Sequence, residues 1–161
     1  FFNKFRCLIP NAFFVITSPD TKFAEKIVIE KYKNLRKYIV INEALYSEIP
    51  NYLSISNFSI GFIKKTFARC AMSPTKLAES LAMGVPVIYN DKIGDVTSII
   101  LNLEAGIVID YKNNSDIENF TKNYKKIINM GGKKLVLNAK SFFDISVANK
   151  KYLAIYNKLD V

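Results

Sequence analysis

The sequence contains no histidine. This absence excludes Ser-His-Asp and Cys-His nucleophile systems, and it excludes metal sites built on histidine ligands. No pair of acidic residues has a spacing typical of metal ligands either. Any chemistry that the chain performs must therefore depend on positioning and electrostatics, and we expect no bound metal.

Cysteine is almost absent as well, because Cys7 and Cys70 are the only two. They lie far apart without a partner pattern, which favours two buried, reduced thiols in a cytoplasmic protein. The sequence also lacks an apolar run of membrane-spanning length and a signal peptide. The chain begins with Phe1 rather than methionine, as an excised fragment would.

Acidic residues are outnumbered, with 14 Asp and Glu against 23 Lys and Arg and a net charge of +9. A basic surface suits nucleic acid, the anionic inner face of a membrane, or phosphorylated small molecules. The lysines are spread along the chain, and there is no Arg-rich segment, zinc-finger spacing or RNA-binding aromatic motif. We therefore expect no nucleic-acid partner, whereas peripheral contact with a membrane stays open.

Apolar runs of strand length alternate with helical patterns along the whole chain. Runs that are apolar throughout indicate parallel strands buried on both faces. With 161 residues, half of them apolar, the chain is long enough for one domain. We therefore predict an α/β fold, a Rossmann-like doubly wound parallel sheet, in a single domain over 1–161. The predicted strands are 12–17, 37–42, 57–63, 85–89 and 106–110.

The stretch 72–91 is the most informative part of the sequence. Ser73 suits a helix N-cap, Pro74 suits the first helical position, and Gly84 suits the end of that helix. The free N–H groups and positive dipole end of such a helix form a potential anion site. A short buried strand follows the helix.

Three polar side chains of this helix are candidates for binding a ligand. Thr75 and Glu79 are four residues apart, so they share a helix face about 6 Å apart along the axis. Lys76 is slightly unfavourable in a first helical turn, which favours an anion nearby. An ordinary solvated lysine and an exposed helix glutamate remain the alternatives.

Ligands of parallel sheets bind at the carboxyl ends of the strands. The predicted first strand ends at Thr17 and Ser18, and the second ends at Asn42 and Glu43. The helix that begins at Ser73 belongs to the same edge. We therefore include these strand ends among the candidate binding residues.

The motif Ser73-Pro-Thr-Lys-Leu-Ala-Glu79, with Leu81-Ala-Met-Gly84-Val-Pro-Val-Ile88, resembles a known family. It is similar to the donor-binding C-terminal domain of GT-B glycosyltransferases, in the large retaining family often called group 1. Flanking features occur in the same order, and the resemblance covers nearly the whole chain. These features are 49–53 before the third strand, Gly94-Asp95-Val96 after the fourth, and 106–110.

The resemblance implies a hexosyltransferase-like transferase of the kind typical of polysaccharide biosynthesis. Such an enzyme would use a UDP-, GDP- or ADP-sugar as its donor and would need no cofactor. Glu79 would bind the ribose hydroxyl groups of that nucleotide sugar. The N–H groups around Ser73, Thr75 and Lys76 would hold the diphosphate. The loop Asn42-Glu43-Ala44 would lie against the base, and Thr17 and Ser18 complete the candidate donor-binding set.

The sequence departs from this family at informative positions. Ala71 stands where the family commonly has a second glutamate that contacts the sugar, so catalytic residues stay unassigned, as does retention or inversion. The Gly-rich turn after the first strand is missing at 17–20. The N-terminal acceptor domain and the family's first strand would precede Phe1, so this domain alone would be inactive.

Two further expectations follow from this comparison. Exposed sheet edges would favour a homo-oligomer or a rearranged sheet. The alternative function is a non-catalytic Rossmann-like nucleotide-binding or interaction module.

Overall fold

The computed structural model describes residues 1–159, which form two compact units. The first unit contains 1–52 and 110–123, and the second contains 53–109 and the chain from 124 onward. Helices α3 and α6 cross the boundaries between them. Within the described residues, no helix is both long and apolar enough to cross a membrane.

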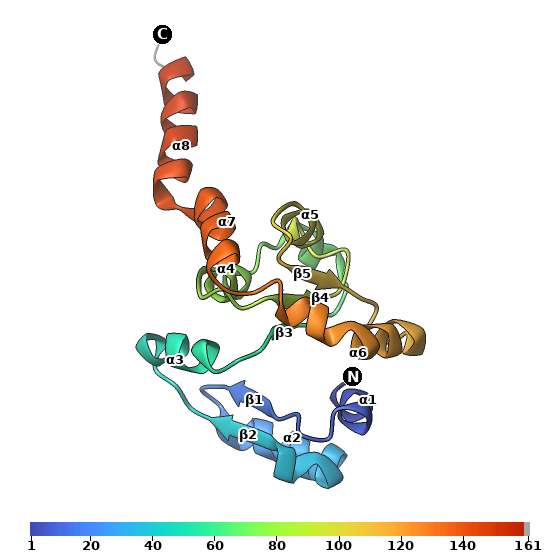
Figure 1. The fold of residues 1–161 in the computed structure, drawn as a ribbon. Helices are drawn as coiled ribbons and strands as arrows, with labels where there is room; N and C mark the ends of the chain where they lie inside the picture. Colours follow the sequence, from blue (N-terminus) through green and yellow to red (C-terminus); the bar gives the residue numbers. More distant parts are fainter. Residues whose placement is uncertain (160–161) are drawn as a thin grey trace. The chain divides into compact units, whose positions relative to one another are not determined.

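The first unit is built around a pair of short parallel strands (Figure 1). β1 and β2 pair in register from Phe14↔Ile39 to Thr17↔Asn42. Asp20 begins the helix between them, because its side chain accepts a hydrogen bond from the N–H of Phe23 at 2.9 Å. The elements up to the boundary are α1 (Phe2–Leu8), β1 (Phe14–Thr17), α2 (Thr21–Tyr32), the 3₁₀ helix η1 (Lys33–Tyr38), β2 (Ile39–Asn42), the 3₁₀ helix η2 (Tyr46–Glu48) and α3 (Ile49–Ser54).

The first unit buries two separate groups of apolar side chains. Val28, Leu35 and Ile39 form one cluster, against which half-buried apolar side chains pack. A second contact joins α1 to α6 (Asn114–Ile128), where the rings of Phe5 and Phe120 lie 5.3 Å apart. Both rings are buried.

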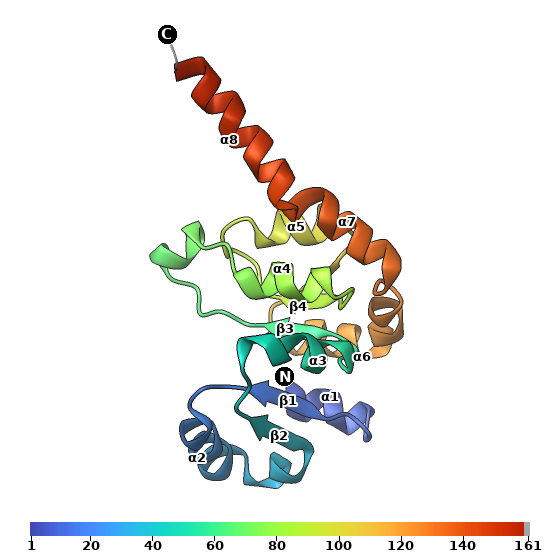
Figure 2. The ribbon, with the colours of Figure 1, turned by 90° about the vertical axis from the view of Figure 1, so that its left-hand side faces the viewer.

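The second unit contains a three-stranded parallel sheet in the order β3-β4-β5 (Figure 2). The register pairs Gly61 with Tyr89 and Tyr89 with Val108. Helix α8 continues from the end of α7 and extends away from this sheet. The elements are β3 (Ser59–Gly61), the 3₁₀ helix η3 (Phe67–Ala71), α4 (Thr75–Ala82), β4 (Val87–Tyr89), α5 (Val96–Asn102), β5 (Gly106–Val108), α7 (Lys133–Phe143) and α8 (Ile145–Leu159).

The core of the second unit is large and continuous. β4 is completely buried, and its side chains pack with those of α4, α5 and α7. Because a strand buried this way has no polar face, its sequence is apolar throughout, as in parallel sheets generally. The cluster contains Leu77, Leu81, Val87, Tyr89, Ile93, Val96, Ile99, Ile100, Leu103, Ala105, Leu135 and Ala139.

The predicted α/β class with parallel strands is confirmed, and all five predicted strands exist. The strands are shorter than the apolar runs that predicted them, because apolar residues next to each strand lie outside its hydrogen-bonded part. The strands form two separate hydrogen-bonded sheets, which the sequence pattern did not indicate. The prediction of two buried thiols is wrong, since Cys7 and Cys70 are both exposed and free.

Candidate functional site

The candidate site of the second unit lies where β3 and β4 end and α4 begins. The chain leaves β3 through a basic loop and η3, and then enters α4. The carboxyl end of a parallel strand and the start of the next helix lie at the same edge of a sheet. The elements therefore place the start of α4 at the edge that the sequence predicted.

Helix α4 begins one residue later than predicted. Its N-cap is Pro74, with φ −72° and ψ 119°, and no side chain caps it, so the prediction of Ser73 as the N-cap is wrong. An extended proline places the first helical residue at Thr75, and the N–H of Leu77 donates to the carbonyl of Pro74 at 3.0 Å. Because the N-cap has no side chain that accepts from the first turn, the N–H groups of Thr75 and Lys76 are available to an external anion.

The side chains at this helix start are exposed, whereas the residues that anchor the helix are buried. Ser73, Thr75 and Lys76 are exposed, and Pro74 and Leu77 are buried. The helix is thus fixed by its apolar face, while the polar side chains of its first turn, Thr75 and Lys76, face solvent. This geometry suits an anion bound by backbone N–H groups, with one lysine contributing positive charge.

Glu79 is half-buried, in the middle of α4. Burial, and secondly the negative charge of Glu79, raise the pKa of Tyr89 to about 12. The Tyr89 ring lies over Gly61, where an added Cβ would be only 2.1 Å from the ring. The carboxylate of Glu79 is therefore close enough to a buried aromatic side chain to affect its titration.

The loop after β4 holds the segment that leads into α4. Gly94 has φ +42°, and an added Cβ would lie 1.8 Å from the carbonyl oxygen of Met72. Its N–H donates to the carbonyl of Arg69 at 3.2 Å. Asp91 forms an ion pair with Lys65, which holds the pKa of the Asp91 carboxyl below its usual value.

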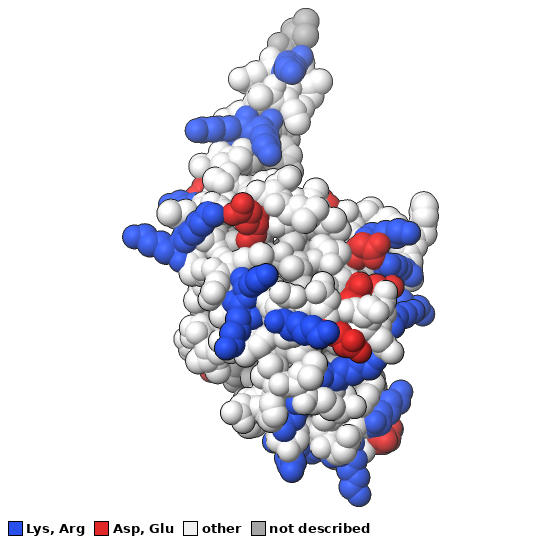
Figure 3. All heavy atoms as spheres, turned by 45° about the vertical axis from the view of Figure 1, so that its right-hand side comes forward, with Lys and Arg blue, Asp and Glu red and all other residues white. Residues whose placement is uncertain are grey.

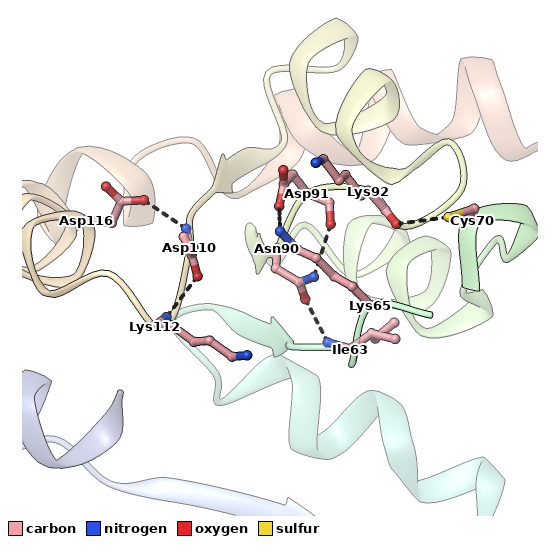
Figure 4. Close-up of polar contacts among 9 residues, drawn as sticks. All are labelled: Ile63, Lys65, Cys70, Asn90, Asp91, Lys92, Asp110, Lys112 and Asp116. Atoms are coloured by element: carbon pink, nitrogen blue, oxygen red, sulfur yellow. Dashed lines mark hydrogen bonds and ion pairs between the residues drawn. The ribbon is translucent and has the colours of Figure 1, made fainter. Parts of the chain in front are cut away.

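Asn90 has a role at this edge that the sequence did not reveal. It is fully buried, and its side-chain oxygen accepts a hydrogen bond from the N–H of Ile63 at 2.7 Å (Figure 4). Its amide nitrogen donates to the carbonyl of Asp91 at 3.1 Å. Asn90 thus links the ends of β3 and β4. A polar residue directly after three buried apolar ones was the available signal.

The remaining predicted residues belong to the first unit. The register pairs Thr17 with Asn42, and the N–H of Ser18 donates to the Asn42 carbonyl at 3.1 Å. The structure therefore brings these three strand-end residues together. Glu43 is exposed and Ala44 is half-buried in the loop that follows.

Two further observations concern chemistry. Ala71, at the end of η3, has no functional group that could act on a sugar. Among residues 1–159, no group of three His, Cys, Asp or Glu side chains is arranged to hold a metal ion.

No family model matches the sequence. No curated protein matches it either. Among solved structures, the chain is similar to AviGT4, a glycosyltransferase involved in avilamycin A biosynthesis, with a TM-score of 0.63 and 10% sequence identity. The match covers 96% of this chain and 45% of AviGT4, so the chain spans less than half of that protein. At this identity the likeness shows the fold alone, an α/β fold with parallel strands that this chain shares with part of AviGT4.

Proposed function

We propose that this chain is the part of a glycosyltransferase that binds the nucleotide diphosphate-sugar donor. The observation that carries the proposal is the exposed, side-chain-uncapped start of α4, with Glu79 one turn further on. The glycosyltransferase-like fold supports it. The proposal concerns the donor, and the nucleotide base, sugar and acceptor are left open.

In this proposal the diphosphate binds at the start of α4. The N–H groups of Thr75 and Lys76 donate to phosphate oxygens, and the Lys76 ammonium group adds positive charge. The diphosphate is also the leaving group of glycosyl transfer. Hydrogen-bond donors that contact the growing negative charge of the diphosphate stabilise the transition state more than they stabilise the bound substrate.

Glu79 is proposed to bind the ribose. A carboxylate can accept hydrogen bonds from two neighbouring hydroxyl groups, which is the arrangement that a ribose 2′,3′-diol offers. One helical turn separates Thr75 from Glu79, about 6 Å along the axis. That spacing allows phosphate and ribose of one nucleotide to contact the same helix.

The strand-end residues of the first unit remain proposed donor contacts. They are Thr17, Ser18, Asn42, Glu43 and Ala44, and each is to be tested by its own variant. We further propose that transfer requires an acceptor-binding half corresponding to the part of AviGT4 that this chain does not span.

Saturation-transfer NMR with UDP, GDP, ADP and their sugar conjugates at millimolar concentration tests donor binding. We expect one nucleotide to show transfer and Glu79→Gln to weaken its binding by about tenfold or more, because two charge-assisted hydrogen bonds are weakened. The matched control is Glu118→Gln, which changes an exposed helix glutamate of the first unit. No transfer from any nucleotide would refute the proposal.

A second pair of variants separates phosphate from ribose recognition. Lys76→Ala should weaken the binding of a nucleoside diphosphate and leave the binding of the corresponding nucleoside unchanged. Lys122→Ala should change the binding of neither ligand. Glu79→Gln should weaken the binding of both the nucleoside diphosphate and the nucleoside. Equal losses with Lys76→Ala and Lys122→Ala would indicate general electrostatic attraction instead of a site.

The alternative is a nucleotide-binding module without transferase activity, and Ala71 is the observation that favours it. Hydrolysis or transfer of the donor sugar by the complete natural protein would exclude this alternative. Tight nucleotide binding without turnover of any donor sugar would support it.

A further inference from the structure

The hydroxyl group of Tyr89, at the end of β4, is a polar group in a buried position. Only 3% of the residue is exposed. Among residues 1–159, no group donates a hydrogen bond to this hydroxyl or accepts one from it. Every side-chain nitrogen or oxygen of the described residues that is closed off from solvent does have a hydrogen-bond partner. The hydroxyl oxygen of Tyr89 therefore lies at an opening.

The structure makes room for this hydroxyl at the end of β3. Tyr89 pairs with Gly61 in the last step of the β3–β4 ladder. A Cβ added to Gly61 would lie 2.1 Å from Cζ of the Tyr89 ring and 2.6 Å from the hydroxyl oxygen. Glycine in a strand often marks such a close approach. The phenol end of the ring thus lies over the Gly61 backbone, and a side chain at this position would displace it.

Folding alone does not account for the hydroxyl of Tyr89. Phenylalanine would fill the same space in the apolar cluster and would avoid the cost of burying a polar group without a hydrogen bond. The hydroxyl lies at the carboxyl ends of β3 and β4, which is where ligands of parallel sheets bind. A bound ligand would supply the missing hydrogen-bond partner.

The charge near Tyr89 indicates which group of a ligand would contact the hydroxyl. Burial, and then the negative charge of Glu79, raise the pKa of Tyr89 to about 12, so the hydroxyl stays protonated at neutral pH and can donate. A phosphate at this position would be repelled by the Glu79 carboxylate. A ribose hydroxyl is neutral, and it can accept from Tyr89 and donate to Glu79 at the same time.

We propose that the Tyr89 hydroxyl donates a hydrogen bond to a ribose hydroxyl of the donor nucleotide, so that the site selects ribonucleotides over deoxyribonucleotides. This inference rests on the proposed nucleotide site at α4, to which it adds a residue of β4. Gly61, Glu79 and Tyr89 all belong to the second unit. A site that hydrogen-bonds a substrate hydroxyl rejects the analogue that lacks it, because polar groups of the site are then left unpaired.

General attraction of anions cannot produce this selectivity. The net charge is +9, and on the face that Figure 3 shows, lysine and arginine side chains are spread widely with acidic ones among them. A ribonucleotide and its deoxy form carry the same charge, so this background acts equally on both. A comparison of the two forms therefore reports on contacts with the ribose hydroxyl.

Titrations followed by ligand-observed NMR test the proposal with UDP, GDP and ADP, each compared with its 2′-deoxy and 3′-deoxy forms. For the nucleotide that binds, we expect one deoxy form to bind about tenfold more weakly, because that form loses contacts with both Tyr89 and Glu79. Tyr89→Phe should weaken binding of the ribonucleotide about fivefold and leave binding of that deoxy form unchanged. Urea denaturation at neutral pH should show that Tyr89→Phe is at least as stable as the original chain, because it removes a buried hydroxyl without a partner.

The matched control is Tyr156→Phe, which removes the hydroxyl of a tyrosine that is 62% exposed on α8 of the same unit. It should change neither stability nor selectivity. If Glu79→Gln weakens binding of the ribonucleotide and Tyr89→Phe does not, the inference is overturned and the proposed nucleotide site stands.

Two other outcomes would also overturn the inference. One is an equal loss of the ribonucleotide and the deoxy form in Tyr89→Phe, because the variant would then have disturbed the packing of the ring instead of one hydrogen bond. The other is no binding of any nucleotide to the original chain, which would refute the proposed function as well.

Discussion

The two units reach stability in different ways. In the second unit, β4 is buried on both faces and joins one large apolar cluster with three helices. In the first unit, two short strands pack with a small cluster around Val28, Leu35 and Ile39, and a separate buried contact joins Phe5 to Phe120. The first unit also has a bidentate polar link, since Arg36 donates to both carboxylate oxygens of Glu25 at 2.9 and 2.6 Å and to the Ile39 carbonyl.

Glycine shows the same difference. All six glycines of the sequence belong to the second unit. Gly106, at φ +147°, leaves no room for a side chain, because an added Cβ would lie 1.9 Å from the Val87 carbonyl oxygen. Close backbone packing of this kind fixes loops in position. The difference teaches that the start of α4 is held by the more densely packed of the two units.

The largest effect should come from removing core volume. Leu81 is fully buried within the large cluster, and Leu35 is 7% exposed in the small one. We expect Leu81→Ala to lower the free energy of unfolding by about 4 kcal/mol and Leu35→Ala by about 2 kcal/mol, because the denser site leaves a larger cavity. Urea denaturation measures both. Equal losses would contradict the difference in packing between the units.

A substitution in the loop after β4 should have the next largest effect. Gly94→Ala combines backbone strain with a collision against Met72, and we expect a loss of about 3 kcal/mol. Gly132→Ala is the control. Alanine would be strained at the φ of +91° that Gly132 adopts, but nothing lies within 4 Å of the added Cβ. Gly94→Ala should also weaken nucleoside diphosphate binding, and Gly132→Ala should not. A Gly94→Ala chain with unchanged stability and binding would show that this loop does not position α4.

Alkaline pH should distinguish buried Tyr89 from half-buried Tyr38. The pKa of Tyr89 is about 12 in the folded chain, above its ordinary value of 10.0, because burial disfavours the phenolate. Its contribution to stability is therefore complete below pH 10 and is lost as the pH rises to 12. Two pKa units correspond to about 3 kcal/mol. Stability measured against pH in the original chain and in Tyr89→Phe tests this loss.

Tyr38 of the first unit should behave in the opposite sense. A hydrogen bond from Lys37, and then the nearby positive charges of Arg6 and Lys37, hold the pKa of Tyr38 below its usual value. Its contribution is present above its ordinary pKa and is lost as the pH falls. In an absorbance titration, Tyr38 should ionise at lower pH than an ordinary tyrosine and Tyr89 at higher pH. Tyr38→Phe should remove the first of these steps and Tyr89→Phe the second. Coincident titration of both would disprove the contrast.

The smallest effects concern ion pairs. The Arg36–Glu25 pair is partly buried and bidentate, so Glu25→Gln should cost about 1 kcal/mol. The Lys134–Glu104 pair of the second unit is exposed, and Glu104→Gln should cause no measurable change. Thermal unfolding in low and high salt checks both variants. A larger loss from Glu104→Gln would show that the second unit also depends on surface charge.

Much of the site was predictable because it depends on local sequence. The apolar spacing of Leu77 and Leu81 and the stop at Gly84 predicted α4 within one residue at its start. Ser73 was wrong as the N-cap because Pro74 is extended, and no local pattern decides between two adjacent residues. The exposure of Cys7 and Cys70 was also missed, since burial depends on what packs over a residue.

Sequence alone determined the α/β class, the order of its elements and the helix that carries Lys76 and Glu79, because periodicity and helix-terminal residues act locally. Only the tertiary structure decided that the strands pair in two sheets, that Asn90 links two strand ends, and that Gly94 packs on Met72. These features depend on contacts between residues distant in the chain. Their energies come from burial and close packing, which no single stretch of sequence contains.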